Sequence, residues 1–192
     1  MTIPKSKFFS YTGQIRQWML WFENIDKNKK ILDFGTGPGW AVFVGLNMGF
    51  DIIGIDLDKF KWKLSECLGV NKHIILYNGS KLPFSNNMFD LILCKAVLNK
   101  TDNLEIDKER ELQRILKNAG MILISPSRHL KYLKNVENKD HLKFSKNREF
   151  KDKALLCLYK DLCEIAKSNI DSIDWKRCTG YIDCCGEEDD TK

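Results

Sequence analysis

Five short apolar runs rich in isoleucine, leucine and valine alternate along the chain with segments of helical character, and this alternation constrains the fold most strongly. Each run has the length of a buried strand. The runs are ILDF from Ile31, DIIGID ending at Asp56, IILY from Ile74, FDLILC from Phe89 and MILIS from Met121. Helices are predicted between them over 40–48, 59–68 and 108–118, the last one stopped by Gly120. Repeated crossovers of this kind predict an α/β fold with a parallel sheet and helices on both faces.

The segments that flank this alternation complete one predicted domain, because 192 residues with 43% hydrophobic content suit a single core. Residues 1–29 form a helical cap, with an amphipathic helix over 14–25. Residues 30–125 are the alternating core. Residues 126–192 hold a basic insert, a helix over 154–167 and a C-terminal hairpin.

The apolar runs and the cysteine usage narrow the classes of protein to which this sequence can belong. No apolar run reaches the length of a membrane helix and the first residues lack a secretory signal, so we expect a cytoplasmic protein with no membrane span. Seven scattered cysteines are an odd number, which favours reduced core thiols over a disulfide framework. Cys178, Cys184 and Cys185 lack a paired Cys-x-x-Cys spacing, and we expect no metal site.

The stretch ILDFGTGPGW, from Ile31 to Trp40, places three glycines at alternate positions directly after the first strand. Glycine permits positive φ and close approach of a ligand, and the following helix offers free N–H groups to an anion. A dinucleotide fingerprint would require a third glycine at position 40, which is Trp40. A P-loop sequence is absent as well. The loop therefore indicates a cofactor with a negative group that is neither a dinucleotide nor a nucleoside triphosphate.

Asp56 ends the second strand 21 residues after Gly35. At this spacing an acidic side chain can accept hydrogen bonds from both hydroxyls of a ribose, although an aspartate at a strand end also serves as a turn or cap residue. The glycine loop favours the ligand role, so a ribose-bearing cofactor is predicted.

Four ordered segments resemble the successive motifs of class I S-adenosylmethionine-dependent methyltransferases, and the likeness covers about residues 30 to 125. They are ILDFGTGPG, IIGIDLD, YNGSKLPFSNNMFDLILC and LQRILKNAGMILIS. The Leu-Pro-Phe sequence in the third segment resembles that of the methyltransferases that act on small molecules. The resemblance implies a Rossmann-like, doubly wound, mostly parallel sheet of about seven strands, with S-adenosyl-L-methionine as cofactor.

The resemblance also implies roles for particular residues. Asp33 would lie near the ammonium of the methionine moiety, Asp56 would hold the ribose and Leu57 would lie against the adenine. Asn78, before Gly79, would meet the adenine amino group, and the backbone near Cys94 would complete the pocket. The implied cofactor-binding residues are Asp33, Gly35, Gly37, Gly39, Asp56, Leu57, Asn78, Gly79 and Cys94.

Methyl transfer from a sulfonium is an in-line displacement that depends chiefly on alignment of the acceptor and exclusion of water. The resemblance therefore predicts a methyltransferase with a small-molecule acceptor. His129 is a candidate general base, or else a solvated loop residue. The insert from Arg128 to Lys153 carries nine Lys/Arg against four Asp/Glu, so it suits a lid over an anionic substrate, an RNA-binding patch or a solvated connector. RNA methylation and cofactor binding without catalysis stay open as alternatives.

Overall fold

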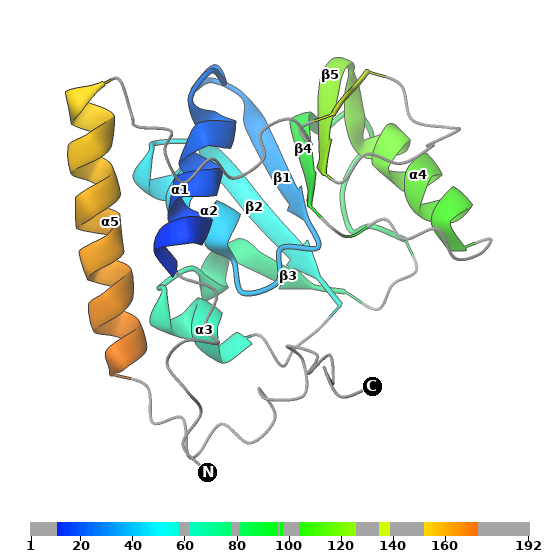
Figure 1. The fold of residues 1–192 in the computed structure, drawn as a ribbon. Coiled ribbons are helices and arrows are strands. Elements are labelled where there is room, and N and C mark those ends of the chain that lie inside the picture. The colour runs from blue at the N-terminus through cyan, green and yellow to red at the C-terminus, as the bar shows by residue number, and fades with distance from the viewer. Residues whose placement is uncertain are drawn as a thin grey trace, which may run out of the picture.

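Six parallel strands form one sheet in the order β3-β2-β1-β4-β5-β6 (Figure 1). The computed structural model describes residues 11–57, 62–77, 81–95, 97, 104–125, 135–138 and 152–172. The strands are β1 (Lys30–Phe34), β2 (Asp51–Asp56), β3 (Ile74–Leu76), β4 (Phe89–Lys95), β5 (Leu116–Ser125) and β6 (Val136–Asn138). The helices are α1 (Tyr11–Phe22), α2 (Trp40–Asn47), α3 (Trp62–Cys67), α4 (Leu104–Ile115) and α5 (Lys153–Asp171), with a 3₁₀ turn η3 (Asn71–His73).

The strand order reverses at β1, which pairs with β2 on one side and with β4 on the other. Asp33 is level with Gly54 of β2 and with Leu93 of β4. In an open α/β sheet, ligands bind beyond the carboxyl ends of the strands at such a switch point. The glycine loop follows β1 directly, so it lies where this rule places a ligand.

One face of the sheet packs against α1, α2 and α3, and α5 lies on the outer side of α1 (Figure 1). Alternate residues of β1 and β4 point to this face, among them Ile31, Leu91 and Leu93. From α1, Trp18 and Phe22 are almost fully buried against them. The helix predicted over 14–25 is therefore confirmed, shifted by three residues toward the N-terminus.

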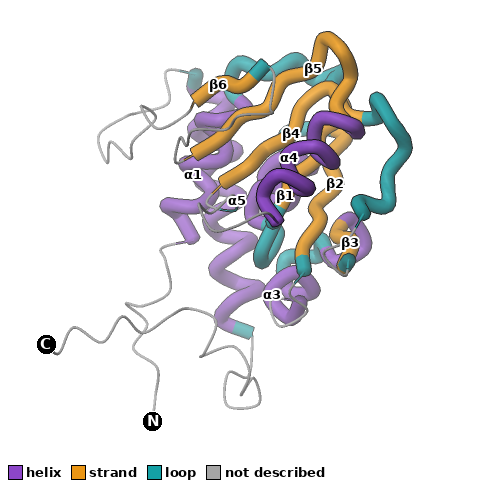
Figure 2. Tube along the Cα trace, turned by 90° about the vertical axis from the view of Figure 1, so that its right-hand side faces the viewer, coloured by secondary structure: helices purple, strands orange, loops and turns teal. Residues whose placement is uncertain are grey.

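The opposite face packs against α4, which lies across it in Figure 2. Leu112 and Ile115 of α4 are fully buried among the other alternate residues of the strands. The loop before β4 adds Leu82 and Phe84 to this cluster. Helices on both faces confirm the predicted doubly wound fold.

The end of α4 differs from the prediction, which continued this helix to residue 118. The helix ends at Ile115, and Leu116 pairs with Phe89 as the first residue of β5. The register then jumps, so residues 117–120 lie opposite the single residue Asp90, and the ammonium of Lys117 donates to the Asp90 carboxylate at 2.8 Å. Gly120 permits this bulge, because a Cβ there would lie 2.9 Å from the Lys117 carbonyl oxygen.

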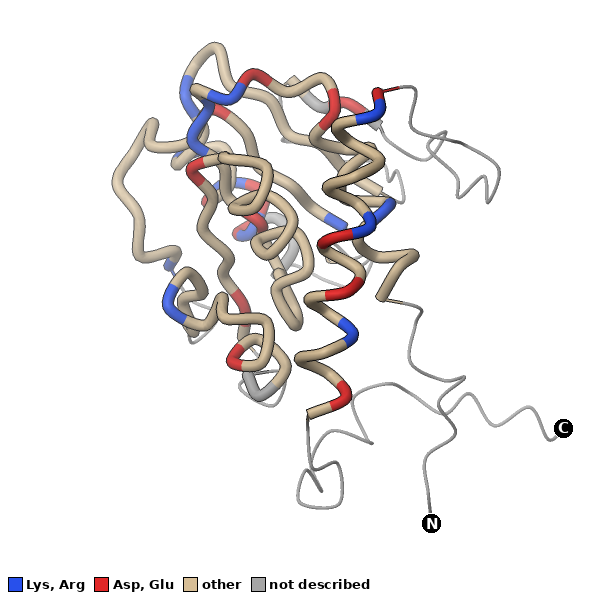
Figure 3. Tube along the Cα trace, turned by 90° about the vertical axis from the view of Figure 1, so that its left-hand side faces the viewer, with Lys and Arg blue, Asp and Glu red and all other residues tan. Residues whose placement is uncertain are grey.

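The helix predicted over 154–167 is present as α5, with Asp152 as N-cap accepting a hydrogen bond from the Ala154 amide at 2.7 Å. Its outer face carries charges of both signs (Figure 3). The described ranges contain six strands, so the number of about seven is not confirmed. The C-terminal hairpin, the three C-terminal cysteines and most of the basic insert lie outside the described residues.

Two expectations about class can be compared with this fold. Within the described residues, no helix has the length and apolar character required to cross a membrane. The four cysteines described there are free thiols, but only Cys94 is buried, whereas Cys157 is exposed. Cys67 and Cys163 are half-buried, and the prediction that most of the seven cysteines lie in the core stays a prediction, because three of them lie outside the described residues.

Candidate functional site

The loop after β1 has a backbone that requires glycine at its alternate positions. Gly35, Gly37 and Gly39 have φ of 71°, 55° and 88°, in the left-handed region that side chains with a Cβ rarely adopt. The amides of Gly35 and Thr36 donate to the Ile55 carbonyl of β2 at 2.9 and 3.1 Å. Helix α2 then begins at Trp40 with Gly39 as its N-cap, so Pro38 precedes the helix instead of opening it.

Gly35 and Gly39 differ in what surrounds them. A Cβ on Gly35 would lie 2.4 Å from Val97, which follows β4, so the bare backbone faces the carboxyl edge of the sheet. A Cβ on Gly39 would lie 2.7 Å from the Ile74 side chain and 2.8 Å from the Val70 side chain, both of the apolar core. Packing alone thus accounts for glycine at position 39.

Asp33 is buried beneath the loop at 2% exposure. One oxygen of its carboxylate accepts a hydrogen bond from the Thr36 hydroxyl at 2.5 Å. Burial raises the pKa of Asp33 to about 7, an effect that Asp56 adds to and that Thr36 and the charge of Lys95 oppose. A cation placed beside this carboxylate would restore its charge, so the site favours a positively charged ligand group.

Asp56 ends β2 next to the loop and is also buried, at 8% exposure. Its Oδ2 accepts a hydrogen bond from the Gly37 amide at 2.6 Å, and its backbone carbonyl accepts one from the Tyr77 amide at 3.1 Å. The carboxylate therefore fixes the loop as well as facing the sheet edge. The next residue, Leu57, is 52% exposed, which leaves an apolar surface directly beside a polar one.

Lys95, the last residue of β4, was not singled out by sequence reasoning. It continues the alternation of Leu91 and Leu93, so it lies on the face of the sheet that α1 covers. Its ammonium donates to Gln14 Oε1 at 3.0 Å and lies 5.2 Å from the centroid of the Trp18 ring. Burial lowers the pKa of Lys95 to about 8, although the negative charge of Asp33 opposes this.

Cys94 points the other way, into the cluster under α4, and is 1% exposed. Burial, with a smaller contribution from Asp33, raises its thiol pKa far above the usual value. A thiol in that environment stays protonated and packs as an apolar group. Its backbone borders the sheet edge, but its side chain lies away from Asp33.

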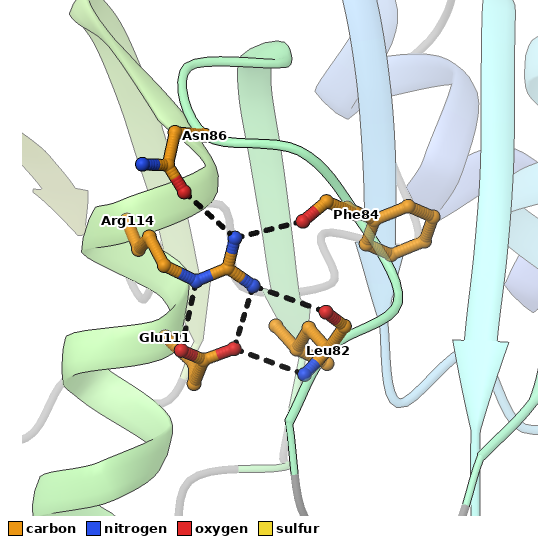
Figure 4. Close-up of polar contacts among 5 residues, drawn as sticks. All are labelled: Leu82, Phe84, Asn86, Glu111 and Arg114. Carbon is orange, nitrogen blue, oxygen red and sulfur yellow. Dashed lines mark hydrogen bonds and ion pairs between the residues drawn. The ribbon is translucent and has the colours of Figure 1, made fainter.

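The loop that precedes β4 is fastened to α4 by Arg114 (Figure 4). The guanidinium donates to the carbonyl oxygens of Leu82 and Phe84 at 3.0 and 2.7 Å, and to the Asn86 side chain at 3.0 Å. Glu111 pairs with it at 2.7 Å and accepts from the Leu82 amide at 2.9 Å. The Leu-Pro-Phe segment is thus held against the C-terminal end of α4.

An open hollow of about 470 Å³ lies beside edge strand β3, lined by Ile75, Leu76, Tyr77, Lys81 and Pro83. Tyr77, which lines this hollow, donates its backbone amide to the carbonyl oxygen of Asp56. Three predicted residues, Asn78, Gly79 and His129, lie outside the described residues. The described part contains no group of three or more residues suited to a metal ion.

The described site therefore brings Asp33, Gly35, Gly37 and Asp56 together at the carboxyl edge of the central strands. Leu57 and the Cys94 backbone border the same edge. Lys95 adds a cation to it. The sequence contained one signal for Lys95, namely its position directly after the fourth apolar run, but its partners on α1 appear only in the folded chain.

Comparison with known proteins finds a family that is similar to part of the chain. Residues 32–124 match the family described as "Methyltransferase domain". Two uncharacterized proteins of Methanocaldococcus jannaschii are each 30% identical: MJ0638 over 55% of this chain and 44% of its own length, and MJ1123 over 61% and 59%. The chain thus spans about half the length of these relatives.

The fold is also found in the crystal structure of the PH0226 protein from Pyrococcus horikoshii OT3, with a TM-score of 0.52 and 22% identity. That match covers 59% of this chain and 57% of the other. The likeness concerns the fold alone. Residues 32–124 are therefore similar in sequence to methyltransferase domains, and the described strands and helices have a Rossmann-like arrangement.

Proposed function

We propose that the chain binds S-adenosylmethionine at the carboxyl edge of β1, β2 and β4 and transfers its methyl group to a small molecule. The observation that carries this proposal is the placement of two buried carboxylates, Asp33 and Asp56, on either side of a loop that only glycine can form. In this proposal, residues 30–125 are the cofactor-binding core of one domain. The opening helix and the insert after the fifth strand would build the side that faces the acceptor.

The residues present fit the chemical groups of this cofactor. Asp33 suits the ammonium of the methionine moiety, because a buried carboxylate with a raised pKa gains most from a neighbouring cation. Asp56, whose Oδ2 accepts a hydrogen bond from the Gly37 amide, suits the ribose hydroxyls as a charged acceptor. Leu57, half exposed, offers an apolar surface for the adenine. Asn78 and Gly79, outside the described residues, stay proposed adenine contacts.

The bound cofactor supplies an activated methyl group, so the chain has to align an acceptor and exclude water. The glycine loop, held by the Asp56 carboxylate, fixes its part of the site in place. Trp18 and the other aromatic residues of α1 form an apolar wall on the face where Lys95 emerges. No described residue is assigned as a general base, and His129 stays a candidate.

Turnover tests this proposal. The purified chain is incubated with methyl-labelled S-adenosylmethionine and a fractionated metabolite extract, and label transfer is measured together with S-adenosylhomocysteine. Labelled product in a small-molecule fraction, lost in an Asp56→Ala variant, is the expected result. Transfer confined to an RNA fraction would refute the small-molecule acceptor.

RNA methylation is the second candidate, favoured by the surplus of five positive charges between Arg128 and Lys153. A phosphate-binding surface makes affinity fall steeply with salt. RNA binding that weakens at least tenfold between 50 and 200 mM salt, roughly the dependence of a few phosphate contacts, would support it. Cofactor binding without turnover on either kind of acceptor would instead support a non-catalytic binding protein.

A further inference from the structure

Lys95 is the one described ammonium that interacts with the buried Asp33 carboxylate, and sequence reasoning gave it no role. The two side chains lie on the same face of the sheet, at the carboxyl ends of the adjacent strands β1 and β4. The Asp33 carboxylate has Thr36 as hydrogen-bond donor. The site thus presents one negative and one positive group at the switch point of the sheet.

Helix α1 holds the Lys95 ammonium in this position. Gln14 Oε1 accepts one of its N–H groups at 3.0 Å, and the Trp18 ring lies 5.2 Å from the nitrogen. An ammonium has three donors, so further N–H groups are available to a ligand beyond the one that Gln14 accepts. Its methylene stem is half-buried, which fixes the direction of the charge.

A zwitterion matches this pair. The methionine end of S-adenosylmethionine carries an ammonium and a carboxylate on the same carbon, so its protein partners must be of opposite sign and close together. If Asp33 takes the ammonium, as in the proposed function on which this inference rests, the adjacent cation faces the carboxylate. Charge-assisted hydrogen bonds between such groups are stronger than neutral ones.

We infer that Lys95, held by Gln14 and Trp18, binds the carboxylate of the cofactor's methionine moiety and thereby makes α1 part of the cofactor site. Lys95 then recognises the cofactor and does not act on the acceptor. The hydrogen bond to Gln14 offsets part of the cost of partly removing this charge from water.

The decarboxylated analogue of S-adenosylmethionine tests this assignment, because it lacks the carboxylate and keeps the ammonium, sulfonium and adenosine. Affinities of both ligands are measured by calorimetric titration for the full chain and for Lys95→Met. The unaltered chain is expected to bind the analogue about 10- to 100-fold more weakly, the usual effect of one lost charged hydrogen bond. Lys95→Met should bind both ligands with affinities within about threefold.

Three further variants sharpen this cycle. Lys117→Met removes a half-exposed lysine that pairs with Asp90 near the other end of β4. This variant should keep the full difference in affinity between S-adenosylmethionine and its decarboxylated analogue. Lys95→Arg should keep most of it, since the charge remains. Gln14→Leu should reduce it partly. If Lys95→Met fails to fold, the affinities of the two ligands for the unaltered chain and for Lys95→Arg still test the assignment.

The outcomes separate this inference from the function on which it rests. If the unaltered chain binds S-adenosylmethionine and its decarboxylated analogue equally well, the Lys95 assignment is wrong and the cofactor site stands. If Lys95→Met weakens both ligands by the same factor, the ammonium does not face the carboxylate. If the unaltered chain binds neither ligand, the proposed function itself fails, and the inference with it.

Discussion

Replacement of Asp33 by asparagine should stabilise the free protein at high pH, although Asp33 belongs to the proposed cofactor site. Burial raises the pKa of this carboxyl from 3.8 to about 7, so the folded chain binds the proton more tightly than the unfolded chain. Stability from this group is fully present below the unfolded pKa and is lost as pH rises through the folded pKa. Asparagine has no titrating proton, and its side-chain oxygen can still accept a hydrogen bond from the Thr36 hydroxyl.

The magnitude follows from the shift of about three pKa units at about 1.4 kcal/mol each. Above pH 7 the ionised carboxylate costs about 4 kcal/mol, and at pH 5 about 2 kcal/mol, because the unfolded carboxyl is already ionised there. The advantage of Asp33→Asn should therefore grow by about 2 to 3 kcal/mol between pH 5 and pH 8, as an upper limit.

Urea unfolding of both proteins at pH 5, 6, 7 and 8 measures the difference. Asp90→Asn is the matched control, because hydrogen bonds from Lys117 and Lys30 lower the pKa of Asp90. That carboxylate contributes stability above its unfolded pKa, which is lost as pH falls, so its removal should destabilise the chain. A stability difference for Asp33→Asn that does not change with pH would refute the reasoning.

Three further perturbations test the loop, the ribose contact and the clamp. Gly35→Ala should lower the free energy of unfolding by about 1 to 3 kcal/mol, since it combines positive φ with a clash against Val97. Gly49 has φ of 84° and open space around it, so Gly49→Ala should cost only the free energy of the strained backbone. A second substitution, Val97→Ala, should restore stability to Gly35→Ala and not to Gly49→Ala. Asp56→Ala should weaken S-adenosylmethionine binding by about 1.5 to 3 kcal/mol in calorimetric titration, and unchanged affinity would remove the ribose assignment. Arg114→Met should lower the free energy of unfolding by about 1 to 3 kcal/mol because it removes the hydrogen bonds to the Leu82 and Phe84 carbonyl oxygens. Asn86→Ala removes only an exposed contact, so it should change the free energy of unfolding by no more than about 0.5 kcal/mol. Equal effects of the two substitutions would contradict a clamp.

The strands and the glycine loop could be predicted because their signals are local. Buried parallel strands appear as continuous apolar runs, and alternate glycines after a strand indicate positive φ. The end of α4 could not be predicted in this way, since helical periodicity does not reveal that Leu116 pairs with Phe89. Gly39 shows a similar limit: the sequence indicates bare backbone there, but only the fold shows that Val70 and Ile74 fill the space.

Lys95 shows what the chain order hides at the site. A lysine at the end of an apolar run is typical of a solvated strand end, and nothing in the sequence connects it with Gln14, which lies 81 residues away. The contact exists because α1 packs on the same face of the sheet as Asp33. A site at a switch point is assembled from several strand ends, so its full set of charges emerges only with the topology.

Parallel calorimetric titrations with S-adenosylmethionine and NAD test the central claim most directly. Trp40 takes the place of the third glycine of a dinucleotide loop, and it begins α2 in the structure. The account predicts saturable binding of S-adenosylmethionine at one site per chain, weakened in Asp56→Ala, and no binding of NAD. Tight binding of NAD with none of S-adenosylmethionine would contradict it.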